Sequence, residues 1–327
     1  MRYKKKMRYK TFGSTGQEIS SVAVGTWAMG GANSAGGSFG EVDRSESIAA
    51  IKAMLEEEVN IIDTAPIYGE GAAEEIVGEA IKGYDREKLY LATKFGSYIS
   101  HFDGKPVRNN KYDPIMREFE DSLERLGTDY IDFYLMHWPD VNTPIEETMA
   151  ALNDLKKAGK IRYTGLCNAS KELIEEALQY GEVNVIQPPF SMVNQSQKEL
   201  MQWAESKGIA TMTSGSLGAG ILTGTIRELP KFDEKDFRLT FYPFFKEPTF
   251  SKIMELLKTL DQIAEKYDKP VAQVAINWST QQSFVNTALL GVRNPQEAKI
   301  NCEAFNWQLA DEDLQAINAE LERLEIG

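Results

Sequence analysis

The sequence predicts an α/β fold, a parallel (β/α)8 barrel of the TIM type with an N-terminal hairpin, long active-site loops and an extra C-terminal helix. Three observations support this. Short apolar segments alternate with amphipathic ones along most of the chain, and the connections between them are short. The turn after the first predicted strand lacks the Gly-x-Gly-x-x-Gly motif of an open dinucleotide-binding sheet. Strand–helix repeats pair in parallel through right-handed crossovers, and eight of them close into a barrel.

Each strand is predicted from a short apolar run, and a hairpin precedes the first one. Residues 9–21 are expected to form this hairpin around Ser14-Thr15-Gly16, because Ser and Gly favour tight turns. The barrel strands are expected at residues 22–24, 61–65, 89–95, 130–138, 161–166, 183–187, 209–213 and 287–291.

The helices are predicted from amphipathic spacing and from residues that start or end helices. Asp43 is a good N-cap for a segment in which apolar residues recur at Ile48 and Ile51. Gly159 and Gly208 suit the C-terminal ends of two later helices. Helices are therefore expected at residues 43–59, 72–82, 113–126, 143–158, 170–180, 195–207, 251–267 and 271–282, with residues 225–246 as a long irregular insertion.

The composition predicts a single globular domain spanning residues 1–327, with residues 1–6 as a disordered tail. Hydrophobic residues make up 42% and charged residues 26%, as in chains that bury a large core. The net charge of −13 argues against nucleic-acid and anionic-membrane partners, which need a basic surface. No apolar run approaches the ~20 residues of a membrane span. Cys167 and Cys302 show no paired spacing, which favours a cytoplasmic location.

The strand ends carry the candidate chemistry, because the active groups of such barrels gather there. Asp63 lies in the second predicted strand, Tyr68 follows on the next loop, and Lys94 and His137 lie near the ends of the third and fourth strands. A nearby ammonium lowers the pKa of a phenol from about 10, and a carboxylate keeps that ammonium charged. Each residue alone is more often an ion-pair, capping or core residue. All four at one end of a barrel favour a tyrosine general acid, with His137 orienting a carbonyl.

The sequence contains no motif for a transition-metal site or for a serine nucleophile. The chain holds two histidines and two cysteines, and no two of these four residues have the spacing of metal ligands, so no metal site is expected. No Gly-x-Ser-x-Gly motif is present, so a serine nucleophile of that type is not expected.

The chain resembles the aldo-keto reductases through five motifs, from the N-terminal hairpin to about residue 319. They are Asp-Thr-Ala-x-x-Tyr-Gly (63–69), Ala-Thr-Lys (92–94), Leu-x-His-Trp-Pro (135–139), Gly-Lys-Ile-Arg-x-x-Gly (159–165) and Gly-x-Arg-x-Pro (291–295). The resemblance, which is to bacterial NADPH-dependent members, implies reduction of an aldehyde, ketone or sugar carbonyl to an alcohol. It implies that Asp63, Tyr68, Lys94 and His137 form the catalytic tetrad, with Tyr68 protonating the carbonyl oxygen as NADPH donates hydride.

The resemblance also implies a site for the dinucleotide. Asn168 and Gln187 match residues that hold the nicotinamide carboxamide, and Phe190 matches the aromatic residue that stacks under the nicotinamide ring. The loop of residues 216–220 matches the pyrophosphate loop, Arg293 the partner of the 2′-phosphate, and Asn301 an adenine contact. The complete implied set is Gly25, Thr26, Asn168, Gln187, Phe190, Ser216, Leu217, Gly218, Gly220, Arg293, Glu297 and Asn301.

Three positions depart from the family pattern. Cys167 replaces a usual serine, and Ser214 replaces a common tyrosine, which opens space beside the cofactor. Glu297 replaces a frequent glutamine near the 2′-phosphate, and a carboxylate there repels a phosphate. NADPH is therefore the expected cofactor, with NAD as a possible alternative.

The expected substrate pocket is formed by Trp27, Tyr68 and Trp138, with loops 97–111 and 225–246 around it. The second loop is rich in phenylalanine, which favours self-packing as well as contact with a ligand. No basic cluster for a phosphate is evident, so the expected substrate is a small carbonyl compound or an unphosphorylated sugar. The sequence does not predict the oligomeric state.

Two alternatives remain open at this stage. One is a non-catalytic nucleotide sensor, since the potassium-channel β subunits share this barrel, its cofactor and much of the tetrad. The other is a lyase that forms a Schiff base through Lys94. Such a lysine must be neutral to attack a carbonyl, whereas Asp63 favours the charged form.

Overall fold

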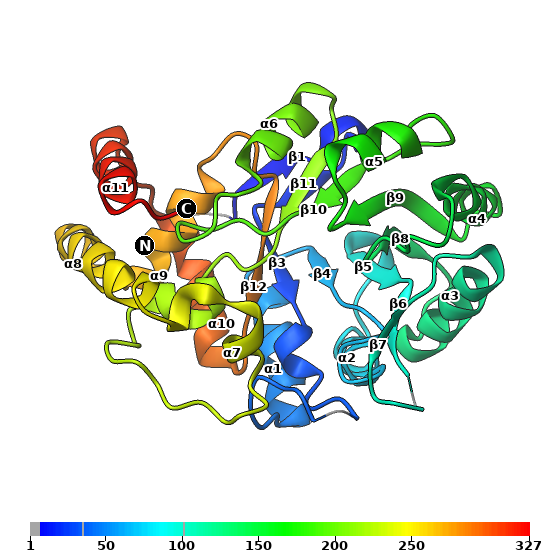
Figure 1. Ribbon diagram of the computed structural model, residues 1–327, viewed down its shortest axis with the longest axis horizontal. Coiled ribbons are helices and arrows are strands. Elements are labelled where there is room, and N and C mark those ends of the chain that lie inside the picture. The colour runs from blue at the N-terminus through cyan, green and yellow to red at the C-terminus, as the bar shows by residue number, and fades with distance from the viewer. Residues whose placement is uncertain (1–6, 35, 101) are drawn as a thin grey trace.

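The centre of the molecule is a closed barrel of parallel strands (Figure 1). The structure is a computed structural model that describes residues 7–34, 36–100 and 102–327. The barrel strands are β3 (Val22–Gly25), β4 (Ile61–Asp63), β5 (Tyr90–Phe95), β8 (Ile131–Met136), β9 (Ile161–Cys167), β10 (Val185–Gln187), β11 (Ala210–Thr213) and β12 (Thr287–Gly291). Each pairs with its neighbours in chain order, and β12 closes the ring by pairing with β3. The predicted (β/α)8 barrel is confirmed.

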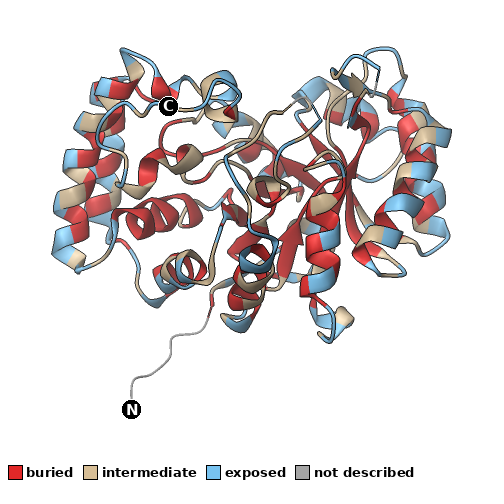
Figure 2. Ribbon diagram, turned by 90° about the horizontal axis from the view of Figure 1, so that it is seen from below, coloured by how far each residue is buried: buried red, intermediate tan, exposed pale blue. Residues whose placement is uncertain are grey.

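Helices surround the barrel and cover the outer faces of its strands. They are α1 (Arg44–Glu56), α2 (Ala72–Ala80), α3 (Tyr112–Leu126), α4 (Ile145–Lys157), α5 (Lys171–Ala177), α6 (Lys198–Ser206), α8 (Thr249–Tyr267), α9 (Val271–Thr280) and α10 (Pro295–Cys302). Figure 2 shows buried residues in the strands and on the inner faces of the helices. The predicted start of α1 is confirmed, because the Asp43 side chain accepts a hydrogen bond from the Glu46 N–H at 3.0 Å. The extra C-terminal helix α11 (Asp311–Leu324) packs beside α8 (Figure 1).

An N-terminal hairpin, β1 (Tyr9–Thr11) and β2 (Glu18–Ser20), precedes the barrel as predicted. Between its strands, the fully buried Phe12 packs edge-on against Phe133, with ring centroids 5.2 Å apart. Both rings belong to an inner core with Ala23 and Ile61 from the first two barrel strands. The hairpin therefore fills the amino end of the barrel and leaves its carboxyl end for the site.

Two segments predicted as loops contain regular structure. The loop after β5 forms a small antiparallel sheet of β6 (Ser97–Ile99) and β7 (Pro106–Arg108). The expectation that residues 225–246 are irregular is wrong in part. The short helix α7 (Phe237–Phe241) and a 3-10 turn (Pro243–Phe245) lie within them. Their aromatic side chains pack on each other and on the carboxyl end of the barrel. This packing joins residues that are distant in sequence, so the local sequence pattern does not predict it.

Two further expectations concern the N-terminal tail and membrane-spanning helices. The predicted disordered tail, residues 1–6, lies outside the described residues. Within the described ranges, none of the helices combines the length and the apolar character that crossing a membrane requires.

Candidate active site

The carboxyl ends of β3, β4, β5 and β8 form one side of an opening, here called the mouth. Asp63 is the last residue of β4, and Lys94 is the penultimate residue of β5. His137 directly follows β8, and its backbone N–H donates to the Phe95 carbonyl at 3.0 Å. Parallel register brings these side chains together at the mouth, as the sequence predicted.

Tyr68 reaches the mouth from the loop between β4 and α2, and glycine backbone fixes this loop in place. Gly69 has a φ of +61°, and a Cβ on it would collide with the Gly30 carbonyl. A Cβ on Gly30 would in turn lie 2.5 Å from the Tyr68 carbonyl carbon. The two backbones therefore touch directly beside the tyrosine, and this contact sets its position.

The Lys94 ammonium is the centre of a buried hydrogen-bond network. It donates to both Asp63 carboxylate oxygens at 2.9 and 2.8 Å and to the Thr64 carbonyl at 2.8 Å. It also lies 3.2 Å from the Tyr68 hydroxyl oxygen, to which it donates. Since that oxygen accepts from Lys94, the Tyr68 O–H hydrogen is available to a different acceptor. Lys94 is 0% exposed and Asp63 is 1% exposed, so bulk water screens this network little.

The electrostatics of the network keep its acid protonated and its ammonium charged. Burial raises the pKa of Tyr68 to about 12, with Lys94 opposing the shift. The predicted effect of the ammonium is thus present but smaller than the effect of desolvation. Burial lowers the pKa of Lys94, but the Asp63 carboxylate together with Tyr68 and Cys167 outweighs it, and the net shift is upward. Burial raises the pKa of Asp63 despite the opposing ammonium.

The His137 ring lies against Tyr68, with centroids 5.7 Å apart and the rings nearly perpendicular. Burial, and then the positive charge of Lys94, hold the pKa of His137 well below its usual range. The imidazole is therefore neutral near pH 7. A neutral imidazole beside the phenol can donate one hydrogen bond to a carbonyl oxygen without competing for the proton.

Two amide side chains, Asn168 and Gln187, present oxygen atoms next to this network. The Asn168 NH₂ group donates to the His137 backbone carbonyl at 2.8 Å. The Gln187 NH₂ group donates to Asp63 at 2.7 Å and to the Met212 sulfur at 3.1 Å. Both NH₂ groups are thus engaged, and within the described ranges neither amide oxygen has a partner. The link from Gln187 to Asp63 has no local sequence signal, because the two residues are 124 positions apart.

Phe190 is not presented at the mouth. Its exposed fraction is 1%, and its ring stacks on Trp278 at 5.4 Å with the edge of Phe284 also in contact. Phe190 follows β10, and its ring packs against Trp278 of α9, so the side chain joins the core. An open stacking surface for a nicotinamide ring is therefore not formed by this residue in the structure.

The loop after β11 contains the predicted phosphate-contacting residues. Gly218 and Gly220 have φ values of +57° and +95°, which allow the tight turn. The backbone N–H groups of Ser216 and Leu217 make no hydrogen bond to other described residues. Gly25 is the last residue of β3, which β12 separates from β11, and Thr26 follows it. The Thr26 hydroxyl donates to the Asp63 backbone carbonyl at 3.0 Å. Free N–H groups of this kind suit an anion.

Arg293 follows β12, the strand next to β11, and pairs with Glu297. Its guanidinium lies 3.3 Å from one Glu297 oxygen, and its backbone N–H donates to the other at 2.9 Å. The pair is solvent-accessible, with the arginine side chain 66% exposed. Asn301 lies one helical turn after Glu297 on α10 and is largely buried. The predicted adenosine contacts therefore lie on α10 and just before its first residue.

The predicted substrate residue Trp27 is enclosed by aromatic rings at the mouth. It stacks near Tyr68, with centroids 6.0 Å apart, and contacts Phe237 and Phe241 of α7. Phe39, which the sequence analysis did not identify, completes the cluster at 4.8 Å. No local pattern marks Phe39, because it lies in an irregular glycine-rich segment. The remaining aromatic residues of the insertion pack on one another, as Phe232 does on Phe245.

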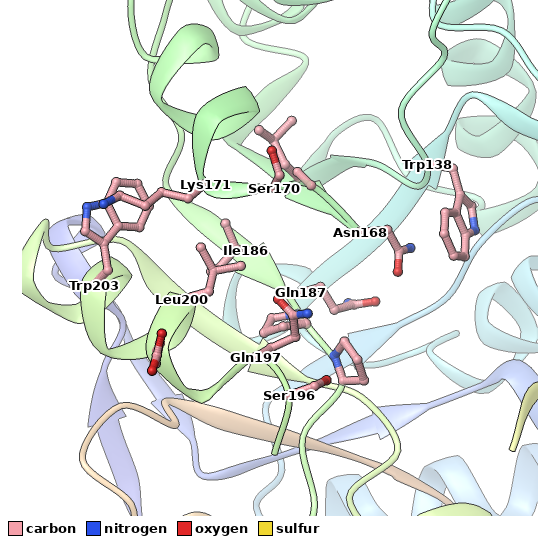
Figure 3. Close-up of a pocket in the computed structure, with 15 residues that line it drawn as sticks. Trp138, Asn168, Ser170, Lys171, Ile186, Gln187, Ser196, Gln197, Leu200 and Trp203 are labelled. Atoms are coloured by element: carbon pink, nitrogen blue, oxygen red, sulfur yellow. The ribbon is translucent and has the colours of Figure 1, made fainter. Parts of the chain in front are cut away.

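Trp138 leads from the mouth into a groove of about 670 Å³ (Figure 3). The guanidinium of Arg108, from β7, lies 4.6 Å from the Trp138 ring centroid. Asn168 and Gln187 line the inner part of the groove, which continues between α5 and α6 to Trp203. Among residues that the structure describes, no three His, Cys, Asp or Glu side chains are grouped as metal ligands.

Comparison with known proteins identifies the family. The model of the aldo/keto reductase family matches residues 21–322, and the chain belongs to this family of oxidoreductases, which act on carbonyl compounds with nicotinamide cofactors. The aldo-keto reductase YhdN of Bacillus subtilis is 38% identical over 97% of this chain and 94% of its own. The NADH-specific methylglyoxal reductase of Escherichia coli is 33% identical over 98% and 100%. A glycerol dehydrogenase structure from Gluconobacter oxydans superposes with a TM-score of 0.85, 34% identity and coverage of 98% and 95%.

Proposed function

We propose that this protein reduces the carbonyl group of a small aldehyde, ketone or unphosphorylated sugar, with Tyr68 as the general acid. The observation that carries the proposal is the buried contact of Lys94 with both Asp63 and the Tyr68 hydroxyl. This arrangement leaves the Tyr68 proton free for a substrate oxygen and places a fixed positive charge beside the phenolate that forms.

In the proposed reaction, a bound nicotinamide cofactor supplies the hydride to the carbonyl carbon. The residues of the protein orient and protonate the carbonyl oxygen of the substrate. His137 orients the carbonyl through a hydrogen bond, Tyr68 transfers its proton as negative charge develops on that oxygen, and Lys94 stabilises the resulting phenolate. A positioned acid of this kind contributes a factor of about 10² to 10⁴ in rate.

The polar groups present fit a nicotinamide dinucleotide. The open oxygens of Asn168 and Gln187 can each accept one N–H of a carboxamide, because their own NH₂ groups are engaged within the protein. The unpaired N–H groups after β11 suit phosphate oxygens. The acceptors at Asn168 and Gln187 thus suit the carboxamide, and the N–H donors after β11 suit the pyrophosphate, of such a ligand.

We infer that Arg293 favours NADPH and that Glu297 allows NADH to be used as well. The exposed guanidinium suits a 2′-phosphate, whereas the Glu297 carboxylate, already paired with it, weakens that attraction. A relative that is 33% identical is described as NADH-specific, and this supports the inference that this protein can use NADH as well.

The two alternative functions are less well supported by the same geometry. A Schiff-base lysine must be neutral, but the Asp63 carboxylate holds Lys94 in its charged form. A nucleotide sensor needs no substrate pocket, whereas the aromatic cluster around Trp27 adjoins Tyr68 here. Both cysteines are free and buried, which is consistent with the expected cytoplasmic location.

The test is a titration of the purified protein with NADPH and NADH, followed through tryptophan fluorescence, and then turnover with a panel of small aldehydes. Binding with aldehyde-dependent oxidation of the reduced cofactor is the expected result. Binding without turnover of any aldehyde, ketone or sugar in the panel would favour the sensor. No binding of either cofactor would overturn the proposed function.

A further inference from the structure

The histidine of the proposed reaction lies on a short segment just beyond the end of a strand. Strand β8 ends one residue before His137, and Trp138 follows. Hydrogen bonds hold this segment on both sides. The His137 N–H donates to the Phe95 carbonyl at 3.0 Å, and the His137 carbonyl accepts from the Asn168 amide at 2.8 Å. The Trp138 carbonyl accepts from the amide of Asn110 at 2.9 Å.

Of the two amide contacts, the one from Asn110 is better protected from water. The Asn110 side chain is buried, with 2% exposed. Asn168 is exposed and lines the groove (Figure 3). Water competes with an exposed hydrogen bond for both of its partners, and it competes less where the donor is buried. The position of residues 137–138 therefore depends more on Asn110 than on Asn168.

Asn110 is itself fixed by contacts from several elements. Its backbone N–H donates to the Asp140 carboxylate at 3.4 Å, and its backbone carbonyl accepts from the Thr148 hydroxyl of α4 at 2.9 Å. Its side-chain oxygen lies against Gly96, where an added Cβ would come within 1.8 Å of that oxygen. Gly96 directly follows β5, so Asn110 lies between the carboxyl ends of β5 and β8.

The side-chain oxygen of Asn110 indicates what this position requires. The oxygen is buried, and it has no hydrogen-bond partner among the described residues. Such an oxygen lowers stability, because it has lost its contact with water without gaining a donor. An amide at this position is therefore not explained by stability alone. The part of the side chain that makes a specific contact is the N–H donor to Trp138.

We propose that Asn110 is a positioning residue, which holds residues 137–138 so that the His137 ring stays packed against Tyr68, where the substrate carbonyl binds. This proposal rests on the proposed function and deepens it, since Asn110 acts on the reaction through His137. Asn110 lies outside the loop after β11 and outside α10, so the affinity for the cofactor is not expected to depend on it.

The first test follows His137 by NMR as the pH is changed. The chain has two histidines, and His101→Gln removes the signal of the other one. In the wild type, burial and the charge of Lys94 keep the pKa of His137 well below its usual range, so the ring should not titrate from about pH 5 to pH 8. In Asn110→Ala, the ring is expected to loosen and take up water, which raises its pKa toward about 6.5. An unchanged titration would overturn the proposal.

Two controls separate the lost donor from a general loss of stability. Asn109→Ala removes the same amide at the neighbouring position, where the side chain accepts from the Lys111 N–H at 3.3 Å. Thr148→Val removes a hydrogen bond to Asn110 but keeps the donor to Trp138. Both should leave the His137 titration as in the wild type, and a rise equal to that in Asn110→Ala would overturn the proposal. If Asn110→Ala does not fold, Asn110→Leu removes the donor and keeps the volume.

Kinetics give a second readout. With an accepted aldehyde, Asn110→Ala is expected to lower kcat by up to about 10², the cost of a displacement of ~1 Å at a reacting group. The Kd for the reduced cofactor should stay near the wild-type value, and kcat should gain a titration that the wild type lacks. An equal weakening of cofactor binding would overturn the proposal.

The NMR result also separates failure of this proposal from failure of the proposed function. A His137 pKa that rises only in the Asn110 variants supports the positioning role even if the wild type reduces no carbonyl compound, a result that would count against reduction alone. A His137 titration that Asn110→Ala leaves unchanged overturns the positioning role even if aldehydes are reduced.

Discussion

At the scale of single residues, the protonation state of Tyr68 controls the proposed chemistry. Burial raises its pKa to about 12, and the charge of Lys94 limits that rise. A phenol with so high a pKa is an acid that stays protonated across the physiological range. Its proton leaves only when a stronger base, the developing alkoxide, is formed next to it. The neighbouring charge of Lys94 then stabilises the product phenolate.

This argument predicts the pH dependence of the reaction. The acid form of Tyr68 persists below its raised pKa, and neutral His137 adds no titration near its ordinary value of about 6.5, so kcat for reduction should be flat from about pH 6 to pH 9. Alcohol oxidation needs the phenolate and should speed up as pH rises. Steady-state rates in both directions check this. A fall in the reduction rate centred near pH 7 would contradict it.

The buried Asp63–Lys94 pair predicts a specific pattern of stability. Asp63→Asn leaves the fully buried ammonium without a counter-charge and should cost about 3–5 kcal/mol of unfolding free energy. The double variant Asp63→Asn with Lys94→Met removes that charge and should recover part of the loss. Denaturant unfolding measures all three proteins. If Asp63→Asn were as stable as the wild type, the buried Lys94 ammonium would not depend on the Asp63 carboxylate, and this would contradict the account.

Glu297 predicts a change in cofactor preference. Glu297→Gln removes the carboxylate that pairs with Arg293, so the Kd for NADPH should fall by up to about fivefold, as expected for one exposed ion pair. The Kd for NADH should stay nearly constant, because NADH has no 2′-phosphate. Fluorescence titrations with both cofactors give the ratio. Equal changes in the Kd values for NADPH and NADH would show that Glu297 does not affect the preference between the two cofactors.

At the scale of elements, the loop between β4 and α2 holds the acid through a contact between two glycines. Gly69→Ala should lower kcat by about 10², because a displacement of ~1 Å at a reacting group costs that much. Gly31→Ala is the matched control, since Gly31 also has a positive φ, +74°, but a Cβ there meets nothing within 4 Å. Similar losses of kcat in both variants would indicate backbone strain alone.

The elements also show how far the sequence predicts the structure. All eight barrel strands were predicted because each is a short apolar run with a turn signal on either side, and Asp63, Lys94 and His137 follow from the parallel arrangement of those runs. The contacts of Phe39 with Trp27, of Gln187 with Asp63 and of Phe190 with Trp278 were not predicted. They join residues distant in sequence, and side-chain direction at a loop depends on packing that local pattern does not encode.

At the scale of the whole molecule, the packing that stabilises the barrel and the residues of the candidate site lie in different parts of it. The hairpin and Phe12 fill the amino end, the helices cover the sides, and the carboxyl end keeps the ion pair, the tyrosine and the groove. The overall charge of −13 surrounds a site whose buried ammonium is balanced by one carboxylate. In the proposed function, the anionic groups of the cofactor are therefore bound by local backbone N–H groups and by Arg293, because the overall negative charge of the protein does not attract them.

The measurement that tests the central claim most directly is turnover by Tyr68→Phe, with cofactor binding measured on the same preparation. The variant removes one hydroxyl, so the Kd for the reduced cofactor should stay near the wild-type value. Reduction of an accepted aldehyde should fall by about 10² to 10⁴, the contribution of a positioned acid. Near-normal turnover with intact binding would contradict the assignment of Tyr68 as the proton donor.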